Sequence, residues 1–345
     1  MRLQSLRDLK DELKEGPALP RDLARALGLE AAARAYRVFA ERVDGVHTRV
    51  VRATGLAIGV ARGRRRGDYR LGVRVQARGR EAAALAEGVR ARAKGEADVR
   101  IVPRVQVRRY PEPRWFRGLR RPLECGLSIG QGAGLAGTLG AIVRDRDGLY
   151  ALSNNHVLAA VNAAEPGDPV AQPGDLDRRM KAATIVGVLD RFVPISFSRS
   201  NVVDCAVAQL FPQVETWPGR NRAARGLLRP PRAVTLDDLG LAVLKAGRTS
   251  GVTRGRITQV EVDRLRVEMG DGRNRIALFS DQIEIEGEDG RPFSADGDSG
   301  SLVIDPLGRP RALLFCGGED ADGRDLTYAN RFETVLAKLG VRMAR

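Results

Sequence analysis

Two short segments contain residues whose types could carry out nucleophilic chemistry. Ser299 lies in the sequence GDSGS at 297–301, and His156 lies in LSNNHVL at 152–158. A serine hydroxyl is a weak nucleophile near neutral pH, and a neighbouring imidazole activates it by taking its proton. A buried carboxylate then orients the imidazole. Because the chain has only two histidines, we take His156 as the candidate base for Ser299.

The candidate carboxylate is Asp204, in the apolar sequence NVVDCAVAQL at 201–210. An acid in such a run is costly to bury as an ion unless a donor such as an imidazole N–H binds it. The alternative is Asp190, which lies beside Arg191 and could simply be solvated. We therefore favour Asp204. The chain order His156, Asp204, Ser299 is one in which this group of residues is found.

With these motifs, the chain from about residue 125 to its end resembles the trypsin-like (chymotrypsin-fold) serine peptidases. It is most similar to bacterial members that lack a secretion signal. Further matching sequences are GTLGAIV at 137–143, KAGRTSG at 245–251 and LLFCGG at 313–318. The resemblance implies a mainly β fold with two barrels. It also implies hydrolysis of peptide bonds through an acyl-enzyme intermediate, with protein or peptide substrates and no cofactor.

The resemblance also implies a role for each matching residue. Ser299 would attack the scissile carbonyl, His156 would act as base and then as acid, and Asp204 would hold the imidazole tautomer. The backbone N–H groups of Gly297 and Ser299 would form the oxyanion hole. Phe293, six residues before the nucleophile, would form the base of the substrate pocket.

Phe315 and Gly317 would line the wall of that pocket. We therefore expect a neutral pocket that takes apolar or small side chains. The acidic sequence EIEGED at 284–289 could alter this preference if it folds over the cleft. An activating amino terminus of the IVGG type is absent around residues 125–130, so activation by cleavage there is not expected.

Each motif also has an ordinary structural interpretation. GDSG is a good turn sequence, because Asp and Ser bond the local backbone and Gly tolerates positive φ. Asn154 and Asn155 could cap a helix that happens to contain His156. His47 has no second histidine or cysteine cluster near it in sequence, so we expect no metal site. The ordered combination of motifs favours the peptidase interpretation.

Length and composition indicate two domains and exclude a membrane span. The chain has 345 residues, of which 43% are hydrophobic, and no window approaches about 18 consecutive apolar residues. The first ten residues alternate charge with leucine, so we expect no signal peptide. Cys125, Cys205 and Cys316 are odd in number and widely spaced. They indicate reduced thiols and a cytoplasmic location rather than a disulfide framework, with Cys205 packed in the core.

Basic charge is concentrated before the peptidase-like region. Residues 1–124 contain 30 Lys and Arg against 15 Asp and Glu, whereas residues 125–345 contain 28 of each. The basic residues are densest in the sequence RGRRR at 62–66 and in the stretch 108–121. Such runs could bind nucleic acid or an acidic protein, or they could be a solvated surface.

Periodicity divides residues 1–124 into a domain at 1–109 and a linker at 110–124. Leucines at helical spacing predict helices over 3–13 and 21–43. Strands are expected at 48–61, 69–77 and 98–107, with a helix at 81–93, which is a ββαβ order typical of a small α+β domain. Three prolines and several arginines predict that the linker is irregular and solvated.

The remaining residues predict a peptidase domain at 125–345 that is built from strands. These strands are expected at 135–144, 149–153, 183–194, 202–210, 241–245, 254–269, 275–286, 301–304 and 311–315, with a helix at 330–339. Our preferred hypothesis is an intracellular serine endopeptidase that its N-terminal domain regulates or recruits. The alternatives are a recruitment or nucleic-acid-binding protein in which the peptidase fold is secondary, and a catalytically silent scaffold.

Overall fold

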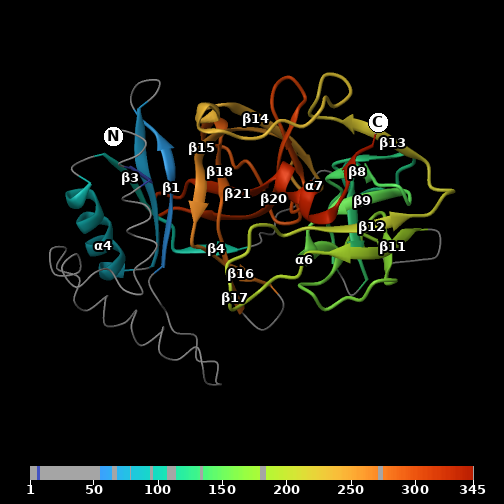
Figure 1. The fold of residues 1–345 in the computed structure, drawn as a ribbon, viewed down its shortest axis with the longest axis horizontal. Helices are drawn as coiled ribbons and strands as arrows, with labels where there is room; N and C mark the ends of the chain where they lie inside the picture. The colour runs from blue at the N-terminus through green and yellow to red at the C-terminus, as the bar shows by residue number, and fades with distance from the viewer. Residues whose placement is uncertain are drawn as a thin grey trace.

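The computed structural model describes residues 6–7, 55–63, 68–77, 79–93, 96–106, 114–132, 135–178, 184–270 and 275–344. The predicted helices over 3–13 and 21–43 lie almost wholly outside these residues. Figure 1 shows three parts in a row along the longest axis: the N-terminal strands with helix α4, a central barrel, and a second barrel that carries the C-terminus.

The barrel that contains His156 is an open sheet of eight strands. Its order is β22-β8-β9-β12-β11-β10-β6-β7. The strands are β6 (Ser128–Gln131), β7 (Gly137–Thr138), β8 (Ala141–Arg144), β9 (Leu149–Ser153), β10 (Pro169–Ala171), β11 (Ile185–Phe192), β12 (Ala206–Leu210) and β22 (Arg342–Met343). Alternate side chains of these strands, such as Ile142, Ala151 and Ala208, point inward and form one apolar core.

The central barrel is closed. Strand β14 pairs with β15 and β19, β15 with β18, β18 with β21, β21 with β20, and β20 with β19, which returns the sheet to its start. Its strands are β14 (Ala242–Gly247), β15 (Gly251–Asp263), β18 (Gln282–Gly287), β19 (Leu302–Ile304), β20 (Pro310–Glu319) and β21 (Asp325–Arg331). Ser299 lies just before β19, on the loop that enters this barrel.

Smaller elements complete the two barrels. Strands β16 (Leu265–Met269) and β17 (Arg275–Phe279) form a hairpin beside the closed barrel, and β5 (Leu123–Cys125) pairs with β13 (Thr216–Asn221). The short helices are α5 (Arg114–Arg117), α6 (Asn155–Leu158), η2 (Leu236–Asp238) and η3 (Glu288–Gly290). Helix α7 (Phe332–Leu339) ends at Gly340 in the left-handed conformation.

The N-terminal unit has the predicted ββαβ order. Its elements are β1 (Gly55–Arg62), β2 (Tyr69–Gln76), α4 (Gly79–Arg92) and β3 (Ala97–Ile101). One face of the three strands packs against α4 through Val73, Val75, Leu85 and Val89. Figure 1 shows α4 on the outer side of these strands, away from the barrels.

The other face of these strands is covered by the closed barrel. Strand β1 pairs antiparallel with β15, with Ile58 opposite Asp263 and Val60 opposite Val260, so one sheet runs from the N-terminal unit into the barrel. A Cβ at Gly72 would meet Gln259 Oε1 of β15 at 2.0 Å. Gly72 therefore allows this close approach, and the face that alternates with the α4-packed face is not solvated.

The predicted strands agree with the structure in place but not always in extent. Strand β9 has the predicted bounds, 149–153. The expected strand at 254–269 is two strands, β15 and β16, that meet at Arg264 with φ of 57°, and the expected strand at 275–286 is divided at Asp281 with φ of 60°. A non-glycine residue in the left-handed region leaves no clear mark in the sequence.

The prediction that the linker at 110–124 has no regular structure was wrong. Helix α5 begins at Arg114, three residues after Pro111 and one after Pro113, and β5 begins at Leu123. The stretch is also tied down, because Arg120 stacks on Trp115 with 5.1 Å from guanidinium carbon to ring centroid. The division into domains at 1–109 and 125–345 stays a prediction. Within the described ranges no helix is both long and apolar enough to cross a membrane.

Candidate active site

His156 lies at the end of β9, where the chain turns into α6. Asn154 precedes this one-turn helix with extended backbone angles, and the N–H groups of Val157 and Leu158 donate to its carbonyl oxygen. The turn places His156 Nδ1 2.5 Å from Asp204 Oδ2. His156 Nε2 is buried and has no hydrogen-bond partner among the described residues. The outer ring nitrogen is therefore available to a substrate or a nucleophile.

Asp204 is fully buried and is held from several sides. The backbone N–H of His156 donates to its Oδ1 at 3.3 Å, and its own N–H donates to Asn330 Oδ1 at 2.9 Å. Asn154 Nδ2 donates to its carbonyl oxygen at 2.7 Å. Asp190, the alternative carboxylate, is only partly buried and pairs with Arg191 instead. The structure thus brings Asp204, and not Asp190, to His156.

The loop that carries Ser299 needs glycine on both sides. Gly297 has φ of 90° and Gly300 has φ of 92°, conformations that residues with a Cβ rarely adopt. A Cβ at Gly300 would also meet Ser153 Oγ at 2.2 Å, so the loop packs directly against the end of β9. Ser299 Oγ donates to the carbonyl oxygen of Phe315 at 3.3 Å.

The Ser299 loop and the His156 turn are connected through Thr138. The N–H of Thr138 donates to the Ser299 carbonyl oxygen at 2.8 Å, and Ser153 Oγ donates to the Thr138 carbonyl oxygen at 2.7 Å. Ser153 is three residues before His156. These contacts fix the two segments to each other across the two barrels.

Asp298, the residue before Ser299, forms a fully buried ion pair with Lys245. Lys245 Nζ donates to Asp298 Oδ2 at 2.8 Å, and neither side chain is exposed. The N–H groups of Thr249 and Ser250 donate to Asp298 Oδ1 at 2.8 and 3.1 Å. Burial would raise the pKa of Asp298, but the Lys245 ammonium and the hydrogen bonds from Ser250 and Thr249 together lower that pKa below its ordinary value. A charge inside the chain therefore holds the loop of Ser299.

Gly297 lies against a second buried cation, Arg248. A Cβ at Gly297 would meet one terminal nitrogen of Arg248 at 2.2 Å. The guanidinium is held by Asp177, to which Arg248 Nε donates at 2.6 Å, and the Gly297 carbonyl oxygen accepts from Thr138 Oγ1 at 2.9 Å. Among the residues with described positions, no protein acceptor takes the N–H of Gly297 or Ser299. Both N–H groups can therefore serve an external oxygen.

Two of the three predicted substrate-binding residues, Phe315 and Gly317, lie on β20, and Phe293 lies in the segment before Ser299. Phe293 is fully buried in the core of the closed barrel, beside Gly255. Phe315 belongs to a different apolar cluster, where the centroid of its ring lies 4.7 Å from the centroid of the Phe279 ring. Gly317 is close to Ser294, whose Oγ would lie 3.5 Å from a Cβ at Gly317. Their pocket roles stay predictions.

Strand β4 (Arg104–Gln106) pairs with the edge of β20 beside Ser299. In this antiparallel pairing Gln106 lies opposite Gly317, Val105 opposite Gly318, and Arg104 opposite Glu319. Val105 is buried and belongs to the same apolar cluster as Phe315. Thus the N-terminal part of the chain occupies the backbone edge that leads to Phe315, the residue whose carbonyl accepts from Ser299.

The three cysteines are free and buried, and Cys205 lies in an apolar cluster as expected. Burial raises the pKa of Cys125 to about 12 and the pKa values of Cys205 and Cys316 well above the ordinary value. Because the thiolate is the reactive form, these thiols are packing groups. A cytoplasmic location stays a prediction.

Sequence reasoning missed several residues that position the site. Lys245 lies in the apolar sequence LAVLKAG, and a lysine in such a strand needs a buried anion. That signal could have suggested its pairing with Asp298. Asn330 and Asp177 gave no comparable signal, because nothing near them in sequence marks them as contacts of Asp204 and Arg248.

Comparisons with known proteins give matches in solved structures alone. No protein-family model and no curated protein matches the sequence. The chain is similar to Thermobifida fusca protease A (14% identity, 64% of this chain and 97% of that one, TM-score 0.45). It is also similar to the Nocardiopsis protease NAPase (15%, 64% and 98%, 0.45) and to an α-lytic protease homologue, N4 (20%, 64% and 99%, 0.44).

The fold itself rests on the strand order of this chain. A closed barrel of six strands follows an open barrel, His156 and Asp204 come from the open barrel, and Ser299 comes from the loop that enters the closed one. The part of the chain that the structure describes is mainly β, with few helices. Its two barrels therefore have the fold of the chymotrypsin-like serine proteases.

Proposed function

We propose that this protein is a serine endopeptidase that cleaves polypeptides through Ser299, His156 and Asp204. The single observation that supports it most is the 2.5 Å contact between His156 Nδ1 and Asp204 Oδ2, with Nε2 buried and without a partner among the described residues. A carboxylate on Nδ1 fixes the tautomer in which Nε2 can accept the serine proton. No cofactor is needed for this chemistry.

The reaction follows from the groups around Ser299. His156 Nε2 takes the proton of Ser299 Oγ as the oxygen attacks the scissile carbonyl carbon. The N–H groups of Gly297 and Ser299 donate to the resulting oxyanion, and His156 then gives the proton to the leaving amine. Water then attacks the acyl carbon while His156 Nε2 takes its proton, and the proton passes to Ser299 Oγ as the ester bond breaks. In the free protein Ser299 Oγ donates to the carbonyl oxygen of Phe315 at 3.3 Å. Hydrogen bonds between catalytic groups are often long or poorly aligned before substrate binds.

The test is labelling with a fluorophosphonate, combined with hydrolysis of a peptide mixture. We expect the full chain to be labelled and to cleave peptides, and Ser299→Ala and His156→Ala to lose nearly all turnover. Because triad members act as a unit, the double variant should be hardly worse than either single one. Near-normal turnover in either single variant would refute the assignment, provided that thermal melting shows all proteins folded.

We propose further that β4 regulates this peptidase by occupying its substrate edge. An extended polypeptide binds a peptidase by adding a strand to an exposed edge, with main-chain hydrogen bonds supplying affinity. The edge of β20 at 317–319 is next to Phe315 and Ser299, but β4 already pairs with it. Substrate and β4 would therefore compete for the same backbone groups.

The competition can be tested by loosening β4 at Val105. Val105→Asp places a charge in an apolar cluster, which should release β4 and raise kcat/KM for a peptide substrate by about tenfold or more. Val252→Asp is the control, because Val252 is exposed on β15. Unchanged or lower kcat/KM in folded Val105→Asp would rule out this form of regulation.

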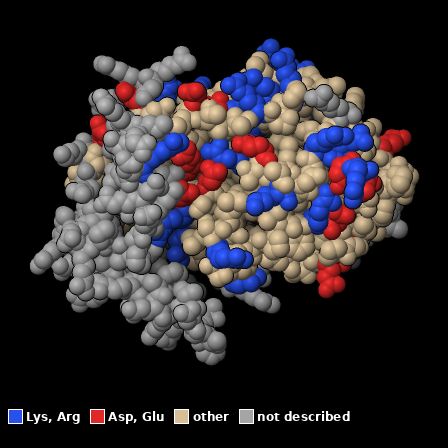
Figure 2. Space-filling view, in the orientation of Figure 1, with Lys and Arg blue, Asp and Glu red and all other residues tan. Residues whose placement is uncertain are grey.

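Recruitment of an external partner by the basic N-terminal region is the second candidate, and one observation weighs against it. Arg74 and Arg100 contact Glu284 and Glu286 of β18 at 2.6 and 2.8 Å, and Arg7 contacts Glu261 at 2.8 Å. Figure 2 shows blue and red atoms side by side over this part of the molecule. Part of the basic charge thus already has an acidic partner within the chain. Binding of nucleic acid or of another acidic protein stays a prediction.

A further inference from the structure

A groove away from the Ser299 loop is lined by apolar side chains and arginines. It has a volume of about 630 Å³, and it lies between the C-terminal strand β22, the end of α7 and the segment 227–231. Its lining includes the apolar side chains of Leu227, Leu228 and Met343 and three arginines, Arg144, Arg229 and Arg342. None of the lining residues that the structure describes is acidic.

Two of these arginines lie directly opposite each other. Arg342 of β22 is the register partner of Arg144 of β8 in an antiparallel pair, so both side chains project from the same face. Like charges in such a pair are destabilising. Both side chains are exposed, and no ion pair or side-chain hydrogen bond joins either to another described residue. An anion placed between them would remove the repulsion.

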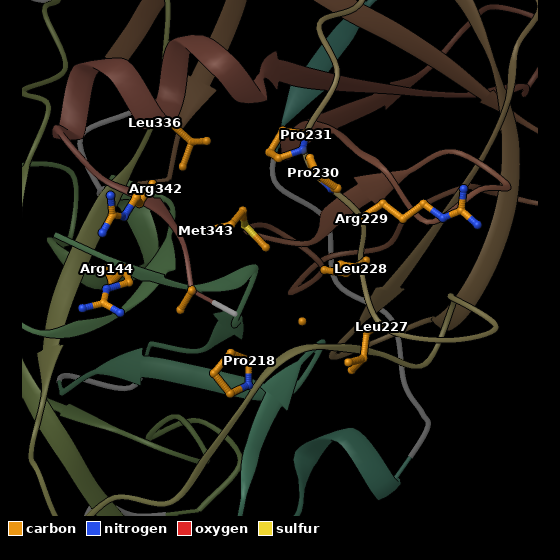
Figure 3. Close-up of a pocket in the computed structure, with 12 residues that line it drawn as sticks. Arg144, Pro218, Leu227, Leu228, Arg229, Pro230, Pro231, Leu336, Arg342 and Met343 are labelled. Carbon is orange, nitrogen blue, oxygen red and sulfur yellow. The ribbon is translucent and has the colours of Figure 1, made fainter.

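Figure 3 shows how the charged and apolar groups are arranged. Met343 and Leu228 point toward the middle of the groove. Arg144 and Arg342 lie next to each other at one rim, with their guanidinium groups directed away from the middle, and Arg229 extends outward at the opposite rim. The ligand that complements this arrangement places apolar side chains in the groove and carboxylates outside it, where the guanidinium groups at the rim can bind them in paired hydrogen bonds.

We propose that this groove binds an acidic segment of a polypeptide in which leucine-like residues alternate with glutamate or aspartate. A small inorganic anion would leave the apolar floor uncovered. A flat lipid surface would not fill a concave site, whereas a volume of this size suits a few residues of chain. The groove adds an anchoring site that is independent of the Ser299 chemistry.

The experiment measures fluorescence anisotropy with the full chain carrying Ser299→Ala, so that the probe is not cleaved. The probe is a fluorescein-labelled peptide of alternating Glu and Leu, compared with an alternating Lys and Leu peptide and an alternating Glu and Gly peptide. We expect saturable one-to-one binding of the Glu and Leu peptide only, and weaker binding at higher salt.

Variants locate the binding. Arg144→Glu combined with Arg342→Glu should weaken binding at least about tenfold, and Leu227→Asp should weaken it through the apolar floor. Leu227 is 63% exposed, so this change should leave the fold intact. Arg254→Glu is the matched control, because Arg254 is exposed on β15 outside the groove.

Several outcomes would overturn the proposal. These are absent binding, equal binding of the Glu and Gly peptide, unchanged affinity in folded groove variants, or binding of anionic vesicles in place of the peptide. None of these outcomes depends on turnover. A chain that fails fluorophosphonate labelling but binds the peptide would refute the peptidase and keep the groove.

Discussion

Lys245 Nζ lies 2.8 Å from Asp298 Oδ2, and both side chains are completely buried. Asp298 adjoins Ser299, and its carboxylate also accepts from the N–H groups of Thr249 and Ser250. An ammonium that is part of the chain therefore binds the carboxylate next to Ser299. We predict that this pairing takes the place of a newly cleaved amino terminus.

Removing this ammonium should disable the site. Lys245→Met leaves the Asp298 carboxylate buried without its partner, which should lower the free energy of unfolding by about 3–5 kcal/mol. Fluorophosphonate labelling should be lost with it. Lys338→Met, at an exposed lysine on α7, is the control, and urea unfolding gives both free energies.

The double variant Lys245→Met with Asp298→Asn provides the sharper comparison. It removes both charges, so its unfolding free energy should exceed that of Lys245→Met alone. A double variant that is no more stable than Lys245→Met would show that the ion pair is not the source of the effect.

The identity of the third catalytic residue can be tested with two matched substitutions. Asp204→Asn should lower kcat by about 10⁴, because the amide favours the wrong imidazole tautomer. Asp190→Asn should leave kcat nearly unchanged, because Asp190 contacts Arg191 rather than His156. Steady-state kinetics on one peptide substrate decides the matter, and the reverse pattern would assign the role to Asp190.

Gly297→Ala should reduce turnover without unfolding the protein. The new Cβ would meet the Arg248 guanidinium, and Gly297 has φ of 90°, so the peptide must move away from the position in which its N–H faces an oxyanion. Loss of one such donor lowers kcat by about 10² to 10³. Gly226→Ala is the control, because nothing lies within 4 Å of its Cβ position. Equal kcat values for the two variants would exclude Gly297 from the oxyanion hole.

Acid should weaken the attachment of the N-terminal unit to the barrel. Burial would raise the pKa of Glu284, but Arg74, together with the Thr258 hydrogen bond and the Arg100 charge, lowers that pKa below its ordinary value of 4.5. The folded protein therefore binds this proton less readily than the unfolded chain. The stabilisation is complete well above pH 4.5 and is lost as the pH falls through the lowered pKa.

This pH effect can be assigned with a double variant. Arg74→Met with Glu284→Gln removes the titrating pair, so its unfolding free energy should fall less steeply than that of the wild type below about pH 4.5. Urea unfolding across the acid range measures both slopes. Parallel slopes would show that other carboxylates cause the acid sensitivity.

Local sequence was sufficient to predict the contact of His156 with Asp204 and the place of many strands. Strand β9 and the turn to His156 follow from a short apolar run that ends in Ser and Asn, which is a signal contained in adjacent residues. Asp204 was identifiable because a charge in an apolar run needs a partner. Phe293, which the resemblance places at the base of the substrate pocket, lies in the core of the closed barrel, and its role in a pocket stays a prediction.

Contacts between distant segments could not be inferred in the same way. The short strand β4 has only three residues, and its pairing partner, β20, comes more than 200 residues later in the chain. The turns at Arg264 and Asp281 have positive φ without glycine. The sequence shows Arg74 only as one of many basic residues in 1–124. Its burial depends on Glu284, and no local sequence pattern links the two residues.

The contact between Arg74 and Glu284 also constrains how this chain can evolve. Each side chain is fully buried, and the guanidinium donates to both carboxylate oxygens, at 2.8 and 2.6 Å. Loss of either partner leaves the other charge buried alone, which is strongly destabilising. Substitutions at positions 74 and 284 should therefore occur together. An N-terminal unit transplanted from a relative would fit this barrel only if it brought an arginine to the same place on β2.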